Sequence, residues 1–398
     1  MLVFVHKIRP DKCTYHTKNC VKRKKVLKMG KWYFSCCKKC DKIFVRMNLC
    51  ETIPLKKGTR KMSEKKPIIG VVMGDSAGVG PELVAKLAAE NFYADYCRPI
   101  IIGDVRILEN ALKVVGGEAA YYAVSSVAEA DWEKGIPVLD QKDQDPADVK
   151  MGELNMMCSV SVNKMLDLAI EMCKTGEIDG FCFGPFNKQG MKLAGCQYES
   201  EHHVMAHAFG VADQPFGEIN VAAGMWTTRT TSHIPISEVS SALSVEKIFR
   251  AITLCHKTLK MAGFENPRIG VAALNPHAGE GGKCGREEID IIAPAIEKAK
   301  EAGMNAMGPD SSDILFHNAF NKKMYDGVVT MFHDQGQIAL KLIGFSGGIT
   351  IAGGQPYPVV TCGHGTAYDI AGKNIVTTDS FANAVKMASQ MAANNKKG

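Results

Sequence analysis

The sequence predicts an α/β protein, and three observations support this class. Short apolar runs alternate along the chain with longer segments that have the apolar spacing of amphipathic helices. Turns rich in glycine or containing histidine directly follow several of the apolar runs. The chain has 398 residues, 46% of them hydrophobic and 23% charged, which is enough for two domains with sizeable cores.

The first 61 residues differ from the rest in charge and cysteine content. They hold 18 lysines and arginines against three acidic residues, a net +15, whereas the remaining 30 basic and 39 acidic residues give −9. Six of the 14 cysteines lie here. Cys37 and Cys40 are a candidate zinc knuckle, and the basic run 22–25 is a candidate nucleic-acid contact. We favour a disordered or non-native leader that precedes a true start at Met62, because no helical or strand periodicity is visible.

The body of the chain after residue 61 has the composition of a cytoplasmic enzyme. Its eight cysteines are scattered, as expected for reduced thiols, and not arranged as a disulfide framework. No apolar run reaches the roughly 18 residues of a membrane span. The acidic balance argues against a nucleic-acid partner. We therefore expect a small-molecule substrate and no membrane contact.

The expected strands are short runs rich in apolar residues, and the expected helices have apolar residues three and four positions apart. Strands are expected at residues 68–73, 99–103, 181–183, 218–223, 225–231, 269–274, 328–332, 349–352 and 358–361. Helices are expected at 83–90, 105–115, 155–175, 245–262, 287–302, 338–342 and 380–393, with another starting near 201. The glycine-rich turn 74–82 joins the first strand to the first helix, an arrangement that cradles a phosphate or substrate. Its glycine spacing matches neither a dinucleotide fingerprint nor a P-loop.

Polar residues follow several of these strands. His233, His277 and His333 each come after a different strand, and ligands bind at the carboxyl ends of strands in a parallel sheet. Three neutral imidazoles can hold one divalent metal, to which Asp313 or Asp334 can add an oxygen ligand. The alternative is that each histidine only satisfies a local hydrogen bond. The shared position after strands favours the metal.

Five segments together resemble the 4-hydroxythreonine-4-phosphate dehydrogenase family of vitamin B6 (pyridoxine and pyridoxal phosphate) biosynthesis. In chain order they are residues 74–82, 184–188, 274–282, 333–336 and 364–367. The resemblance extends from residue 66 to about 393. The segment 363–373 is also similar to the loop with which the related isocitrate and isopropylmalate dehydrogenases hold the adenosine of NAD.

The resemblance implies a two-domain α/β/α subunit of the isocitrate and isopropylmalate dehydrogenase type, with a cleft between the domains. Residues 62–190 with 335–398 are the expected cofactor-side domain, and 191–334 the metal, substrate and dimerisation domain. The implied assembly is a homodimer with shared active sites. A divalent metal, Zn, Co, Mg or Mn, is expected on His233 and His277 of one chain and His333 of its partner.

Further roles follow from the resemblance. Asp313 and Lys341 are the acid–base candidates. The implied substrate-binding residues are His202, Asn187, Lys188, Lys341 and Thr350. The implied NAD-binding residues are Gly74, Asp75, His364, Gly365, Thr366, Ala367 and Asp369.

The chain departs from the family pattern at substrate positions. The usual Gly-His-Thr-Glu segment reads Ser-Glu-His-His at 200–203, so the substrate-binding histidine is displaced or replaced, and His202 is our candidate. Thr350 and Val359 stand where the family has an asparagine and an arginine that contact the substrate. Loss of that arginine weakens phosphate recognition unless another group compensates.

The implied reaction is oxidation of a phosphorylated β-hydroxy acid by NAD, with metal assistance and decarboxylation of the product. The expected substrate is 4-hydroxythreonine 4-phosphate. Alternatives within the family are 4-phospho-D-threonate or erythronate and an unphosphorylated cis-dihydrodiol carboxylate. A different class is a metal-dependent hydrolase or lyase that uses the same histidines without a nicotinamide, which the adenosine-type loop argues against.

Overall fold

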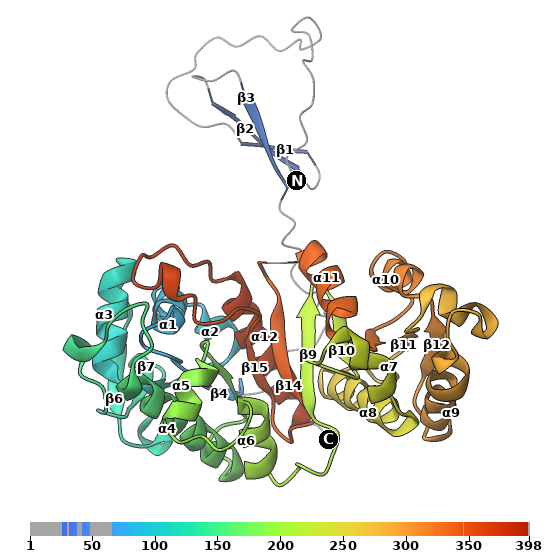
Figure 1. Cartoon of the computed structure of the whole chain (residues 1–398). Coiled ribbons are helices and arrows are strands. Elements are labelled where there is room, and N and C mark those ends of the chain that lie inside the picture. The colour runs from blue at the N-terminus through green and yellow to red at the C-terminus, as the bar shows by residue number, and fades with distance from the viewer. Residues whose placement is uncertain (1–25, 30–31, 38–41, 48–65, 345, 397–398) are drawn as a thin grey trace, which may run out of the picture. The chain divides into compact units, whose positions relative to one another are not determined.

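The computed structural model describes residues 26–29, 32–37, 42–47, 66–344 and 346–396. The chain divides into two compact units, Met1–Glu51 and Thr52–Gly398. In the first unit β1 (Val26–Met29), β2 (Trp32–Cys37) and β3 (Lys42–Met47) form an antiparallel sheet (Figure 1). The sequence predicted no regular structure there, because basic residues interrupt its apolar runs. Cys40 of the candidate zinc knuckle, the basic run 22–25 and Met62 lie outside the described residues.

The second unit is built on one twelve-stranded sheet, in the order β12-β11-β13-β10-β9-β14-β15-β8-β4-β5-β7-β6. The strands are β4 (Ile68–Val72), β5 (Arg98–Gly103), β6 (Tyr121–Val124), β7 (Ile136–Asp140), β8 (Gly180–Phe183), β9 (Gly217–Ala222), β10 (Met225–Arg229), β11 (Ile269–Ala272), β12 (Ala306–Asp310), β13 (Gly327–Thr330), β14 (Ile349–Gly353) and β15 (Val359–Cys362). The expected α/β class is confirmed.

The sheet consists of two parallel blocks that run in opposite directions. β15, β8, β4, β5, β7 and β6 are parallel to one another. β10, β13, β11 and β12 are also parallel to one another. Between the blocks, β14 and β9 are antiparallel to their neighbours. The carboxyl ends of the two blocks therefore lie along opposite edges of the sheet, where an edge is the row of strand ends and not an outermost strand.

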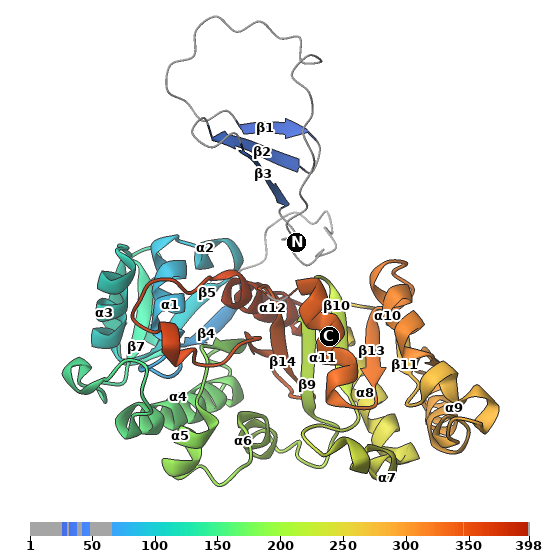
Figure 2. The same ribbon diagram turned by 45° about the horizontal axis from the view of Figure 1, so that its top comes forward.

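Helices cover both faces of this sheet (Figures 1 and 2), and four of those described begin with a side-chain cap. They are α1 (Gly80–Ala89), α2 (Tyr93–Tyr96), α3 (Val105–Val115), α4 (Met156–Lys174), α5 (Lys188–Leu193), α6 (Glu201–Ala208), α7 (Val239–Ala242), α8 (Val245–Met261), α9 (Ala293–Glu301), α10 (Ser312–Phe320), α11 (His333–Gly344) and α12 (Asp379–Asn395). The side chain of Asn155 caps α4 by accepting from two backbone amides, and Asp104 caps α3, which ends at the left-handed Gly116. α8 and α11 pack against β9 and β10 (Figures 1 and 2).

The main apolar core extends along most of the sheet. Its fully buried side chains include Ile69, Phe181, Ile351 and Phe381. Each such side chain contributes roughly 1.5–3 kcal/mol when it is withdrawn from water. A smaller cluster, which includes Leu315 and Leu340, lies beneath α10 and α11. The two clusters hold the strands whose ends carry the predicted site residues.

The expected helix at 287–302 is two segments, a π-helical turn at Glu288–Ile292 followed by α9. Pro294 in the first turn of α9 lacks an N–H, so a regular α-helical bond cannot form at that position. The sheet is continuous through both of the domains expected within 62–398, so their boundaries stay a prediction. Among the residues described, no helix combines the length and the apolar character needed to cross a membrane.

Candidate active site

Three of the motif segments meet at the carboxyl ends of β4, β8 and β15, which are adjacent and parallel. Asp75 N donates to Pro185 O at 3.1 Å. A Cβ atom on Gly78 would lie 2.8 Å from Thr366 O, so only glycine allows this approach. The glycine-rich turn after β4 therefore packs directly against the turns after β8 and β15.

A chain of hydrogen bonds joins the same three segments through their side chains. Tyr368 Oη donates to Asp75 Oδ2 at 2.5 Å, and Asn187 Nδ2 donates to Tyr368 Oη at 3.1 Å. Burial is the largest influence on Asp75 and raises its pKa, although the bonds from Tyr368 and Ala77 oppose this. Asn187 Oδ1 also accepts from Gly190 N at 2.9 Å and so caps α5. Asn187 is thus held between two structural contacts.

The amides of the glycine-rich turn already bind protein oxygens. Ala77 N donates to Asp75 Oδ1, Gly78 N donates to Asp75 O, and Val79 N donates to Thr366 O, each at 3.0 Å. A bound phosphate would have to displace these acceptors. The turn is therefore better suited to holding the neighbouring loops than to cradling a phosphate.

The predicted cofactor turn after β15 is more open. Gly363, His364, Gly365 and Asp369 are exposed. No atom lies within 4 Å of the position a Cβ would take on Gly365. Ala367 has the left-handed φ of 46°. The exposed backbone of this turn is accessible to a ligand.

The three predicted metal ligands lie where the sequence placed them relative to the strands. His233 follows β10, His277 follows β11, and His333 begins α11 just after β13. These three strands are adjacent and parallel in the sheet. The histidines therefore lie along one edge of it.

His233 and His333 are neighbours. Their ring centroids are 5.5 Å apart. Together with Phe332 and Asp334 they line a pocket of about 240 Å³. His333 Nδ1 donates to Asp334 Oδ1 at 2.7 Å, which leaves the lone pair of His333 Nε2 to ligate a metal.

The backbone at two of the histidines is strained. His233 has a φ of 54°, and His277 begins a run of left-handed residues that includes Ala278 and Glu280. Such conformations cost roughly 1–2 kcal/mol for a residue other than glycine. Glu288 stabilises the turn, because its Oε1 accepts from Leu274 N at 2.9 Å and Asn275 N at 2.7 Å. Strain held in this way is common at functional sites.

The two acid–base candidates differ in their surroundings. Asp313 lies in the first turn of α10, and Ser311 Oγ donates to its Oδ1 at 2.9 Å. That bond, with a smaller contribution from His277, lowers the pKa of Asp313, so the side chain is ionised at neutral pH. Lys341 lies on the exposed side of α11, between the exposed apolar residues Ile338 and Leu342.

The two neighbouring imidazoles suit a divalent metal, but the described residues of this chain do not complete a donor set around them. In the part of the chain that the structure describes, no three His, Cys, Asp or Glu side chains are grouped closely enough to hold an ion. Two imidazoles on one tetrahedral zinc have ring centroids about 5 Å apart, close to the separation of His233 and His333. The addition of His277, and the subunit from which each ligand comes, stay predictions.

A network of polar side chains around the central strands joins three of the five predicted substrate residues, Lys188, His202 and Thr350, and leaves out Asn187 and Lys341. Thr350 Oγ1 accepts from Asn220 Nδ2 at 3.0 Å, and Asn220 Oδ1 accepts from Arg229 Nη1 at 2.9 Å. Arg229 Nη2 donates to Glu218 Oε2 at 2.6 Å, and Glu218 Oε1 lies 3.7 Å from His202 Nε2. We call the connected residues the substrate network. Its members are Lys188, Glu201, His202, Glu218, Asn220, Arg229, Gln337 and Thr350.

Burial and charge set the protonation of this network. His202 is 5% exposed, and burial lowers its pKa despite the two nearby carboxylates, so the imidazole is neutral. Burial raises the pKa of Glu218, but its charged neighbours lower it more; because His202 is neutral, the charge and hydrogen bond of Arg229 carry this effect, and the carboxylate is ionised. Lys188 Nζ lies 3.9 Å from Glu201 Oε2. The charges of the two carboxylates, on Glu201 and Glu218, therefore balance those of the two cations, on Lys188 and Arg229.

The sequence interpretation missed Glu218, Asn220 and Arg229. The strand β9 alternates, with Ile219 and Val221 buried in the main core and the polar residues on the opposite face. That period of two was visible in the sequence and could have identified Glu218 and Asn220. Arg229 ends β10 without a comparable pattern.

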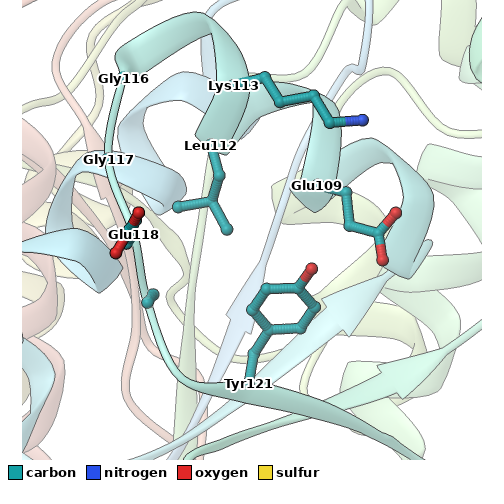
Figure 3. Close-up of a pocket in the computed structure, with 8 residues that line it drawn as sticks. Glu109, Leu112, Lys113, Gly116, Gly117, Glu118 and Tyr121 are labelled. Carbon is teal, nitrogen blue, oxygen red and sulfur yellow. The ribbon is translucent and has the colours of Figure 1, made fainter.

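A separate pocket of about 610 Å³ lies between α3 and β6, at the far end of the sheet (Figure 3). Glu109, Lys113 and Tyr121 line it, and none of the predicted site residues does. It is unconnected with the two edges described above, and we assign it no role.

Comparison with known proteins agrees with these motifs. The profile of the family "Pyridoxal phosphate biosynthetic protein PdxA" matches residues 95–388. A Rhizobium meliloti (strain 1021) protein provisionally named 4-hydroxythreonine-4-phosphate dehydrogenase 2 is 42% identical over 337 residues, covering 84% of this chain and 96% of that protein. The D-threonate 4-phosphate dehydrogenase of Cupriavidus necator is 33% identical and covers 83% of this chain and 99% of its own length.

Solved structures give the same result. A crystal structure of a 4-hydroxythreonine-4-phosphate dehydrogenase from Burkholderia phymatum is 34% identical, with a TM-score of 0.72, and covers 82% of this chain and 99% of that one. The Klebsiella pneumoniae enzyme of the same name is 30% identical, with a TM-score of 0.75, over 83% of this chain and 99% of that one. The resemblance drawn from the motifs is thus confirmed, and the chain belongs to the family of the pyridoxal phosphate biosynthetic protein PdxA.

Proposed function

We propose that this chain is an NAD- and divalent-metal-dependent dehydrogenase that oxidises a phosphorylated β-hydroxy acid, 4-hydroxythreonine 4-phosphate or a close analogue, and releases carbon dioxide. The observation that carries the proposal is the pair His233 and His333, whose rings lie 5.5 Å apart at the ends of adjacent strands. The relatives reported above are named as dehydrogenases, and the expectation of an enzyme acting on a CH–OH group is confirmed by them.

The residues at the site have complementary roles in this proposal. His233, His277 and His333 would hold a divalent metal, which would supply Lewis-acid stabilisation of the substrate oxygens, and bound NAD would be the hydride acceptor. Asp313 is ionised and is suited to accept the hydroxyl proton. Lys341 is a cationic donor on the same helix as His333. The Asp334 carboxylate fixes the tautomer of His333.

The cofactor is proposed to bind at the exposed turn 363–369. The proposed contacts are His364, Gly365, Thr366, Ala367 and Asp369, and the buried Gly74 and Asp75 support them from the turn after β4. The chain from Asp75 through Tyr368 to Asn187 holds this turn against the loops after β4 and β8. NAD is expected to be preferred over NADP.

A second substrate, D-threonate 4-phosphate, is favoured by specific observations. Cupriavidus necator has a relative named for that activity. Thr350 and Val359 differ from the family pattern, and so does Glu201, which is 8% exposed in the first turn of α6. A terephthalate dihydrodiol dehydrogenase structure is only 24% identical, and this likeness shows the fold alone.

A homodimer with shared sites is also proposed. Ile338 is 60% and Leu342 82% exposed, one helical turn apart on α11, which begins at His333. Ile236, 71% exposed, follows His233 closely. Apolar side chains in such numbers beside a site are typical of a surface that another chain covers.

The test is turnover with NAD and added metal, followed at 340 nm, on 4-hydroxythreonine 4-phosphate, D-threonate 4-phosphate and an unphosphorylated dihydrodiol carboxylate. Activity on one of the phosphorylated acids that is lost in His277→Ala supports the proposal. Reduction of NAD by none of the three, in metal-loaded protein, refutes it.

A further inference from the structure

The position of the family's substrate arginine is closed to a ligand in this chain. Val359 is 0% exposed in β15, where it pairs with Phe181 in the main core. Thr350 stands at the second altered position, and its hydroxyl already accepts from Asn220. If this enzyme binds an anionic substrate at that place, the cation has to come from another element.

Arg229 lies on the same polar face as Thr350. Thr350 pairs with Asn220 across β14 and β9, and Asn220 in turn bonds to Arg229. The guanidinium is therefore two hydrogen bonds from Thr350. Its side chain is 9% exposed, which is low for an arginine that serves only solubility.

Three partners hold the guanidinium of Arg229 in one orientation. Nε donates to Ser232 Oγ at 2.6 Å, Nη1 to Asn220 Oδ1 at 2.9 Å, and Nη2 to Glu218 Oε2 at 2.6 Å. An arginine side chain has five N–H donors, so two of them remain for a ligand. A planar group that is fixed in advance loses little conformational entropy when it binds a carboxylate or a phosphate.

We propose that Arg229 binds the anionic end of the substrate and so replaces, from β10, the arginine that the family carries on β15. This inference rests on the proposed function. Glu218 compensates the charge of Arg229 in the free enzyme and sets its orientation. Phosphate and carboxylate are both oxyanions that a guanidinium binds, and both occur in the proposed substrates.

The test compares Arg229→Met, Arg229→Lys and Glu218→Gln with the wild type. Each full-length protein is assayed on D-threonate 4-phosphate and 4-hydroxythreonine 4-phosphate. It is also assayed on D-threonate and 4-hydroxythreonine, the same two acids without phosphate. We expect Arg229→Met to raise the KM of the preferred phosphorylated acid at least tenfold, with a smaller change in kcat. Arg229→Lys keeps the charge but not the planar donors, so its KM should lie between those of the wild type and Arg229→Met.

The unphosphorylated acids identify the anion. If Arg229 binds the phosphate, Arg229→Met lowers kcat/KM for the phosphorylated acid far more than for its unphosphorylated form. If it binds the carboxylate, both fall in parallel. Glu218→Gln removes the competing charge and keeps an acceptor oxygen for Arg229, so the KM of the phosphorylated acid should fall.

Two outcomes overturn the inference. One is an Arg229→Met enzyme whose KM values stay within twofold of the wild type. The other is a parallel loss of activity and melting temperature in Arg229→Met and Glu218→Gln, which indicates a purely structural ion pair. Calorimetric binding of the two phosphorylated acids to the wild type and to Arg229→Met tests Arg229 without turnover. A wild type that binds an acid through Arg229 but reduces no NAD refutes the proposed function and not this inference.

Discussion

Replacement of Glu288 by alanine should both destabilise the fold and loosen the turn that carries His277. Glu288 is 3% exposed at the start of the π-helical turn. Its Oε1 accepts from two backbone amides, and its Oε2 accepts from Asn275 Nδ2 at 3.0 Å. The left-handed run from His277 onward follows directly after these anchored amides.

The expected magnitude follows from the bonds that are lost. Glu288→Ala leaves the amides of Leu274 and Asn275 without their acceptor, at roughly 1–3 kcal/mol each if both stay dry. Both amides are only partly buried, so water can replace part of the loss. We therefore expect a decrease of about 2–4 kcal/mol in the free energy of unfolding. Glu288→Gln keeps one acceptor oxygen and should lose about half as much.

The assay is urea denaturation at pH 7, with Glu287→Ala as the matched control. Glu287 is adjacent and carries the same charge, but its bonds are to the side chains of Ser240 and Asn275. It should lose no more than about 1 kcal/mol. The bound metal of each purified protein is measured in parallel, and only Glu288→Ala should lose it. Equal unfolding free energies for the two variants, or wild-type metal content in Glu288→Ala, would refute the reasoning.

Three further predictions concern other parts of the structure. The side chain of Asp104 accepts hydrogen bonds from Arg106 and Gln144. Burial raises the pKa of Asp104, but these bonds lower it more. Asp104→Asn should therefore lower the free energy of unfolding by about 1–3 kcal/mol at pH 7, and by progressively less as the pH falls below 3.8. A difference in the free energy of unfolding between Asp104→Asn and the wild type that does not change with pH would contradict this prediction. Tyr368→Phe removes the hydrogen bond to Asp75 and should lower the free energy of unfolding in urea by about 1.5–3 kcal/mol. An unchanged free energy of unfolding would show that this bond does not stabilise the fold. Leu342→Asp should shift sedimentation toward a monomer. Ile375→Asp, which changes an exposed apolar residue away from α11, should not. A dimer that Leu342→Asp leaves intact would show that α11 is not in the interface.

The strands that the sequence predicted well are the buried ones with continuous apolar runs. β6 escaped prediction because its first three residues are half-buried or exposed at the end of the sheet. β12 escaped because Gly308 and Pro309 are typical of a turn. β12 is the strand at the other end of the sheet, where a residue without an N–H is tolerated. β7 also escaped, although it is an interior strand, because Pro137 interrupts its short apolar run. Local patterns therefore predict strands with continuous apolar runs better than short or interrupted ones.

The position of the histidines after strands was predictable, because it depends on local order in the sequence. The direction of the two parallel blocks was not. It is set by the pairing of β9 with β14, in which Asn220 faces Thr350 across 130 residues of chain. The same pairing assembles the substrate network. Arg229 reaches Asn220 through the local hairpin of β9 and β10, and only the pairing of β9 with β14 joins both of them to Thr350.

The opposed blocks also constrain how an active site can be assembled. The predicted cofactor turn follows β15, and the predicted metal ligands follow β10, β11 and β13, at the opposite edge of the sheet. Hydride transfer would require the nicotinamide to contact the carbon that bears the metal-ligated hydroxyl. The substrate network is centred on Glu218, Asn220 and Thr350 of β9 and β14, the two strands that belong to neither block, and extends to Arg229 on β10. A second chain whose exposed α11 packs against this face would bring its own histidine to the substrate, which is why loss of the dimer through Leu342→Asp should remove activity together with assembly.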